Sequence, residues 1–331
     1  MFTKIISKVF NSSPRQWISA VAHRLDLPGS PSFDHKKAAS LEHELRRRFN
    51  QYKTDHLKGI SPSDLRSSLE SRIEIIDIEA EGYSEEELDR QRDLSIKFRW
   101  GHNHDFGTFK LAGEMGDRHI KLMANFCALF PITLQDFAQK QIFDIGCWTG
   151  GTTLLLATLE CNVTALEEVK KYSQTASFLA ESFGIQDRVE VLPSSIYDCN
   201  HPSFYNRFDI IYFPGVIYHV SDPLIALRIL FNATKPGGTM LLETAGLDVP
   251  EPFCQFDGSL IHHSGSKQRL NRGGWNWFLP SASAMQRMLR EAGFDQIQTL
   301  YLHGTGRIYG YARKTTQSPI CKAGLSIPHI R

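Results

Sequence analysis

The sequence predicts an α/β protein with a doubly wound, Rossmann-like, mostly parallel sheet and a helical N-terminal extension. From about residue 118, short apolar runs alternate with amphipathic stretches, which is typical of βαβ units. Before that, residues 1–97 are highly charged and helical in pattern, with capping signals at Ser61–Pro62 and at Ser84. We expect a helical extension at 1–97, an α/β domain at 98–315 and a flexible tail at 316–331.

The elements of the α/β domain follow from its apolar runs. The strand candidates are QIFDIG, NVTALE, VEVLPS, the first part of FDIIYFPGVIYH, and TMLLET. Helices are expected within 150–160, 170–184 and 221–234, and the turn KPGG should lead into the fifth strand. A helix in PSASAMQRMLREAGF should stop at Gly293, before two closing strands at 297–304 and 307–314.

Composition narrows the class of protein. The 331 residues are 41% hydrophobic and 22% charged, which is ordinary for a soluble protein. A formal net charge of +1 argues against a large nucleic-acid footprint. Six cysteines lie far apart without a CxxC pair, which favours reduced thiols in a cytoplasmic protein. The sequence has no run of eighteen apolar residues, so a membrane-spanning helix is not predicted. Residues 1–24 lack acids and fit a targeting segment or an amphipathic helix; we favour the helix.

The stretch IFDIGCWTGG, residues 142–151, is the most informative motif. Trp148 stands where the dinucleotide fingerprint G-x-G-x-x-G needs a glycine, so a pyrophosphate ligand is not indicated. The pattern that remains is D-x-G-x-x-x-G, formed by Asp144, Gly146 and Gly150. Glu167 ends the next strand, where an acid can accept hydrogen bonds from ribose hydroxyls. Together these residues predict S-adenosylmethionine as the cofactor, with Asp144 near its ammonium end.

The sequence also resembles the class I S-adenosylmethionine-dependent methyltransferases. It is most similar to the branch containing the tRNA wobble-uridine (5-oxyacetic acid) carboxymethyltransferase, through FGTFKLAG, FDIGCWTGG, PGVIYHVSDPL, KPGGTMLLET and NWFLPSASAMQRMLREAGF. The resemblance implies that Ser195 and Ile196 flank the adenine, that Pro214 and Gly215 lie beneath the sulfonium, and that Tyr218 faces the transferable group. The full set of implied cofactor-binding residues is Asp144, Gly146, Cys147, Trp148, Gly150, Glu167, Ser195, Ile196 and Gly215.

The chain departs from that branch at one informative position. The tRNA enzymes use a carboxylated cofactor, and a lysine before their G-P-F stretch reads its carboxylate. Phe106 stands at the matching position, and the tryptophan-rich acidic stretch that follows is replaced by EMGDRH, residues 114–119. An unpaired carboxylate in the site would be costly. We therefore expect ordinary S-adenosylmethionine and simple methyl transfer.

Two further segments bear on the chemistry. Tyr218 and His219 are the predicted catalytic residues: Tyr218 would line the reactive centre, and His219 would take the proton of a hydroxyl acceptor or else pack behind Tyr218. The loop NRGGWNWFLPS offers a predicted substrate-binding set, although Trp277 could instead be a core residue. That set is Arg272, Trp275, Asn276 and Trp277.

A metal site is not expected. His102, His104 and Asp105 lie within four residues, and His262 and His263 are adjacent in the sequence. The pattern of WGHNHDFG nevertheless favours a lid over the cofactor.

The predicted function is O-methylation of a small or medium polar acceptor. One alternative is a tRNA wobble-uridine modifying (carboxy)methyltransferase, and another is a non-catalytic cofactor-binding module. We expect a small-molecule partner before tRNA, no membrane, and possible homo-oligomers through the N-terminal helices.

Overall fold

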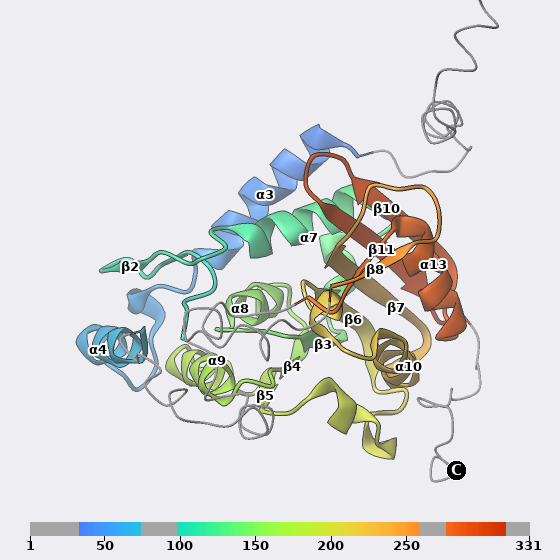
Figure 1. The fold of residues 1–331 in the computed structure, drawn as a ribbon. Coiled ribbons are helices and arrows are strands. Elements are labelled where there is room, and N and C mark those ends of the chain that lie inside the picture. The colour runs from blue at the N-terminus through green and yellow to red at the C-terminus, as the bar shows by residue number, and fades with distance from the viewer. Residues whose placement is uncertain (1–32, 74–97, 258–275, 316–331) are drawn as a thin grey trace, which may run out of the picture.

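The computed structural model describes residues 33–73, 98–257 and 276–315, and they contain a seven-stranded sheet (Figure 1). Its strand order is β10-β11-β7-β6-β3-β4-β5. Strands β3 to β7 of this sheet are parallel, and β11 runs antiparallel to both β7 and β10. The predicted fold class is confirmed. The bounds are β3 Gln141–Ile145, β4 Asn162–Leu166, β5 Val189–Leu192, β6 Phe208–Pro214, β7 Thr234–Ala245, β10 Asp295–Leu302 and β11 Arg307–Arg313.

Helices cover both faces of the sheet because successive strand residues point to opposite sides. Ile142 packs into the cluster on the face of α7 (Arg118–Leu129), α8 (Gly151–Ala157) and α9 (Lys170–Ser182). Phe143 and Ile145 pack into the cluster on the opposite face. That face is covered by α10 (Pro223–Ala233) and α13 (Ala282–Glu291) (Figure 1). Asp144 alternates with these residues, so its carboxylate points toward α8.

Two N-terminal helices, α3 (His35–Phe49) and α4 (Pro62–Ile73), are present as predicted. The helix α3 lies along α7 (Figure 1), and Leu45 and Phe49 are buried in the same cluster as the helices of the sheet. Ser61 caps α4, since its Oγ accepts the Asp64 N–H at 3.1 Å. The domain boundary at residue 97 stays a prediction. Residues 1–24, Ser84 and the tail from 316 lie outside the described residues.

Short elements complete the described chain. The predicted lid holds a hairpin of β1 (His104–Asp105) and β2 (Lys110–Leu111), and β8 (Cys254–Phe256) pairs with β9 (Phe278–Pro280). The 3-10 helices are η1 Thr54–His56, η2 Leu134–Phe137, η3 Ile196–Cys199, η4 Pro202–Phe204 and η5 Ile217–His219. In the described part of the chain, no helix has the length and apolar character needed to cross a membrane.

One predicted turn is part of a strand. KPGG belongs to β7, which begins at Thr234 opposite Phe208 and shifts register before Thr239 meets Ile210. Gly237 has φ +82°, a backbone conformation that favours glycine and that absorbs the shift. The glycine in KPGG does adopt the positive φ that a turn needs, but it does so at an irregularity within β7 and not in a turn before the strand.

The sheet order places a crevice at one edge. The chain leaves β3 toward β4 and β5 on one side, and later returns to β6 on the other side of β3. In doubly wound sheets, ligands bind outside the carboxyl ends of the strands at such a reversal. The loops after β3, β4 and β6 are therefore the place where a site is expected.

Candidate active site

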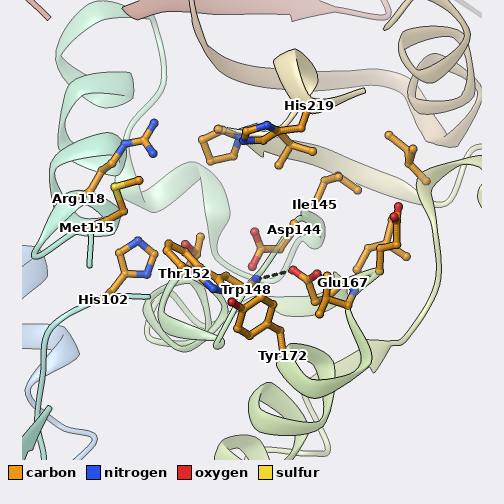
Figure 2. Close-up of a pocket in the computed structure, with 18 of the residues that line it drawn as sticks. His102, Met115, Arg118, Asp144, Ile145, Trp148, Thr152, Glu167, Tyr172 and His219 are labelled. Atoms are coloured by element: carbon orange, nitrogen blue, oxygen red, sulfur yellow. Dashed lines mark hydrogen bonds between the residues drawn. The ribbon is translucent and has the colours of Figure 1, made fainter. Parts of the chain in front are cut away.

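A cavity of about 280 Å³ lies at the carboxyl ends of β3, β4 and β6 (Figure 2). Its volume is near the lower end of the range for small-molecule sites. It brings together predicted residues from loops that are far apart in the sequence. Those that line it are Asp144, Gly146, Trp148, Glu167, Ile196, Gly215, Tyr218 and His219, along with Pro214.

Asp144 supplies a buried carboxyl group to the cavity. Its Oδ2 accepts the Thr153 hydroxyl at 2.7 Å. Burial raises the pKa of this carboxyl to about 7; the Thr153 hydrogen bond lowers the pKa and the nearby charge of Glu167 raises it. A carboxyl group so placed becomes fully ionised near neutral pH only when a cation comes close.

Glu167, directly after β4, shapes the loop that follows β3. Its Oε2 accepts the Trp148 N–H at 2.9 Å, and its Oε1 accepts the Val169 N–H at 2.9 Å (Figure 2). Each carboxylate oxygen can accept more than one hydrogen bond. The same side chain can therefore hold the two loops together and still receive hydroxyl groups from the cavity side.

Trp148 adopts φ +53°, a left-handed conformation that is unusual for a bulky residue. Such strain costs about 1–3 kcal/mol. The hydrogen bond to Glu167 and the packing of the indole offset it: the ring lies edge-on to Tyr172 and His102, with centroids 6.0 Å away in each case. A methyl group on Gly101 would lie 3.0 Å from the indole. The ring thus packs beneath the segment predicted to be a lid and forms part of the cavity wall.

Three predicted cofactor-binding residues do not line the cavity. The buried Cys147 contacts its own loop, where its Sγ lies 3.9 Å from the Trp148 carbonyl oxygen. Gly150, with φ +86°, is the N-cap of α8 and packs on Ala176. Ser195 caps η3 and donates to Glu168 at 3.2 Å, while its neighbour Ser194 lines the cavity in its place. Cofactor binding by these three residues stays a prediction.

The predicted substrate loop is only partly described. Arg272 and Trp275 lie outside the described residues. Asn276 and Trp277 are half-buried and do not line the cavity. The backbone N–H of Trp277 donates to the backbone carbonyl of Tyr218 at 2.7 Å, so Trp277 is held beside η5.

Tyr218 and His219 both lie on η5 and line the cavity, with ring centroids 4.0 Å apart. His219 thus reaches the cavity as well as contacting the Tyr218 ring. The Arg307 guanidinium lies 5.3 Å from the centre of the Tyr218 ring, a cation–π distance. The catalytic roles of Tyr218 and His219 stay predictions.

A buried ion cluster beside Tyr218 was missed at the level of sequence. Nη2 of Arg118 donates to both oxygens of Glu243, at 2.8 and 3.0 Å, and Nε of Arg307 donates to Oε1 at 2.9 Å. Glu243 is fully buried in β7, whereas Arg118, the first residue of α7, lines the cavity (Figure 2). A cation therefore lines the cavity, although Phe106 stands where the related branch has its lysine. Phe106 is fully buried and stacked on His104, and the cavity cation comes from EMGDRH instead.

The histidines of the predicted lid have a structural place. His104 contacts the Tyr52 carbonyl at 2.7 Å, and burial lowers its pKa to about 4. His102 lines the cavity, and burial likewise lowers its pKa to about 4. Among the described residues, no group of three or more His, Cys, Asp and Glu could hold a metal ion. His262 and His263 are outside the described residues.

A model of the methyltransferase domain family matches residues 117–299, which is more than half of the chain and includes the whole sequence from Arg118 to Trp277. The chain belongs to this methyltransferase family. The match, together with the fold and the cavity, identifies the chain as a class I methyltransferase whose cofactor is S-adenosylmethionine.

Two curated relatives of this methyltransferase share one name. The tRNA U34 carboxymethyltransferase of Desulfotalea psychrophila is 30% identical over 173 residues, which are 51% of this chain and 50% of that protein. The protein of the same name from Helicobacter pylori (strain Shi470) is 29% identical over 168 residues, 49% of this chain and 59% of its own. The chain spans about half the length of the first of these relatives.

Solved structures are similar at lower identity. The N-terminal domain of EvdMO1, crystallised in the presence of S-adenosylhomocysteine and D-fucose, is 17% identical with a TM-score of 0.48, covering 70% of this chain and 97% of that one. The phosphoethanolamine N-methyltransferase 2 of Haemonchus contortus, in complex with S-adenosylmethionine, is 14% identical with a TM-score of 0.44. The match covers 60% of this chain and 52% of that one.

The residues of the methyltransferase cavity fit this cofactor. A methyl group on Gly146 would lie 2.4 Å from Val216, so only glycine leaves that part of the loop open. Asp144 offers a carboxyl group to an ammonium, and Glu167 offers oxygens to ribose hydroxyls. Ile145, Leu166 and Ile196 supply apolar surface. The cradle thus matches a nucleoside with a cationic amino-acid tail.

We expect cofactor binding to be coupled to ionisation of Asp144. The Asp144 carboxyl has a pKa of about 7 in the folded chain and 3.8 as a free side chain, so its contribution to stability is present at low pH and is lost as pH rises through 7. An ammonium favours the ionised form. S-adenosylhomocysteine should therefore bind more tightly as pH rises from about 6 to 8, and should release a proton.

This coupling can be measured by calorimetry near pH 6.5 in two buffers of different ionisation enthalpy. The observed heats should differ between the buffers for the unchanged protein and agree for Asp144→Asn. Equal heats in both buffers for the unchanged protein would show that Asp144 does not meet the ammonium.

Proposed function

We propose that this methyltransferase transfers a methyl group from S-adenosylmethionine to a hydroxyl of a small or medium polar acceptor. The observation that carries the proposal is the position of His219. It lines the same cavity as Asp144 and Glu167, on the loop after β6, beside Tyr218. An imidazole there can accept the proton of a hydroxyl while that oxygen attacks.

The contributions of the chain are binding, orientation and exclusion of water. When bound, S-adenosylmethionine supplies an electrophilic methyl group on a sulfonium. Asp144 would hold its ammonium and Glu167 its ribose, while Trp148 and the segment around His102 would close one wall against solvent. Correct alignment of acceptor and methyl can itself lower the barrier by several kcal/mol. His219 then takes the acceptor proton.

A second candidate is modification of a tRNA wobble uridine, by methyl or carboxymethyl transfer. Two observations favour it: the relatives named tRNA U34 carboxymethyltransferase, and the cation Arg118 in the cavity, which could meet a carboxylated cofactor. Mass spectrometry of the copurified ligand separates methyl transfer, which uses ordinary S-adenosylmethionine, from carboxymethyl transfer. With the ordinary cofactor, the absence of tRNA binding supports O-methylation of a small acceptor. A carboxylated cofactor, with salt-sensitive tRNA binding, supports the second candidate.

We also propose a cytoplasmic location and self-association through the N-terminal helices.

Substitution of the two η5 side chains tests catalysis directly. His219→Ala should slow conversion of S-adenosylmethionine to S-adenosylhomocysteine by about 100- to 10,000-fold with a panel of hydroxylated acceptors, since a general base is lost. Tyr218→Phe should have a smaller effect. S-adenosylhomocysteine affinity, the control, should stay within about threefold because neither ring is assigned to the cofactor. Full turnover in the double variant would contradict both catalytic assignments, whereas cofactor binding without turnover by the unchanged protein would favour the non-catalytic module.

A further inference from the structure

The cavity has two chemically different ends. Asp144, Glu167 and Glu168 line it at the ends of β3 and β4, the end assigned to the cationic cofactor. Arg118 and His219 line it near α7 and β6 (Figure 2), and Tyr218 lines it beside His219. A ligand that joins the two ends should therefore carry positive charge at the first and complement positive charge at the second.

The second end carries an excess of one positive charge. The Arg118 and Arg307 guanidiniums share one fully buried carboxylate, that of Glu243. Two cations and one anion leave a net charge of +1, in a region where burial weakens the screening by water.

Arg118 also keeps donors for a ligand. Its hydrogen bonds to Glu243 run through Nη2 alone, and among the described residues Nη1 and Nε donate to no protein group. A methyl group on Gly215, with φ +75°, would lie 3.5 Å from Nη1, so a glycine at this position leaves the guanidinium edge uncovered. A guanidinium edge presents donors in the geometry that carboxylate and phosphate groups match.

We propose that the Arg118–Glu243–Arg307 cluster binds an anionic group of the acceptor, a carboxylate or a phosphate, next to the hydroxyl that is methylated. The inference rests on the proposed function and adds the acceptor's class to it. A net positive cluster beside a bound sulfonium repels it unless an anion lies between them. The acceptor's anion provides this compensation and holds its hydroxyl beside His219.

The test uses benzoate and benzamide as probes, because they share shape and differ in charge. With S-adenosylhomocysteine bound to the full chain, benzoate should bind about tenfold or more tightly than benzamide in a calorimetric or NMR titration. Inorganic phosphate, titrated in parallel, distinguishes a preference for a carboxylate from one for a phosphate. Equal affinities for benzoate and benzamide would overturn the proposal.

Variants locate the effect. Arg118→Gln should remove the preference for benzoate, whereas Arg118→Lys should keep part of it and guards against a folding defect in the glutamine variant. Arg66→Gln is the matched control, since Arg66 pairs with Glu70 at 2.8 Å on α4, outside the cavity lining. A benzoate preference that persists in folded Arg118→Gln would assign the anion to another group.

The outcomes also separate this inference from the proposed function. Failure of the unchanged protein to bind S-adenosylhomocysteine would contradict the proposed function. Turnover of neutral hydroxyl acceptors as fast as matched anionic ones would contradict the anion site alone. A copurified cofactor with an extra carboxylate would place the anion on the cofactor, and would overturn the assignment to the acceptor.

Discussion

Replacement of Glu243 by alanine should destabilise the protein by about 3–5 kcal/mol, the cost of leaving buried charges without their partner. The Glu243 side chain is 0% exposed, and its carboxylate accepts from Arg118 and Arg307. Without it, two half-buried guanidiniums face each other across an empty position. The two guanidiniums would repel each other, and neither could be fully solvated by water.

The effect can be measured from the midpoint of denaturant unfolding at constant slope. Glu190→Ala is the control, because Glu190 also pairs with an arginine, Arg207, at 2.8 Å, but is 54% exposed. Exposed pairs contribute about 0–1 kcal/mol. Glu243→Gln should fall between the two, since it keeps the shape and loses the charge. A shift for Glu243→Ala as small as that for Glu190→Ala would mean that the cluster is solvated.

The cluster shows which part of the site was beyond prediction from sequence. Glu243 lies in TMLLET, a run correctly predicted as a strand, and an acid at the end of a buried apolar run was a signal that it needs a buried partner. Its partners come from α7 and β11. No local pattern joins three elements so far apart in the chain, so the ion cluster could be found only from the tertiary structure.

The fold itself was predictable for a local reason. Parallel strands buried on both faces are short and rich in apolar residues, and QIFDIG and NVTALE fit this pattern because four residues of each strand are buried. Their carboxyl ends place Asp144 and Glu167 in one cavity by topology alone. In contrast, the contribution of Ser194 rather than Ser195 depends on the start of η3, because element ends are the least predictable part of a sequence reading.

Substitution of Glu167 by alanine should weaken S-adenosylhomocysteine binding by about a hundredfold or more. Loss of charge-assisted hydrogen bonds to ribose hydroxyls alone would cost about 1.5–3 kcal/mol. The structure adds a second loss: the Trp148 and Val169 N–H groups would no longer have their acceptor. Trp148 already holds a strained φ of +53°, so its loop would relax away from the cofactor.

Glu168→Ala is the matched comparison for this prediction. Glu168 is the next residue and also lines the cavity, but its side chain is exposed and accepts from the Ser195 hydroxyl. Its loss should change affinity by less than about tenfold, the scale of one exposed hydrogen bond. Calorimetry gives both affinities, and the melting temperature of each apo protein reports on the loop. Unchanged affinity in Glu167→Ala would contradict the ribose assignment, whereas a lower melting temperature with unchanged affinity would leave Glu167 only its role in holding the Trp148 loop.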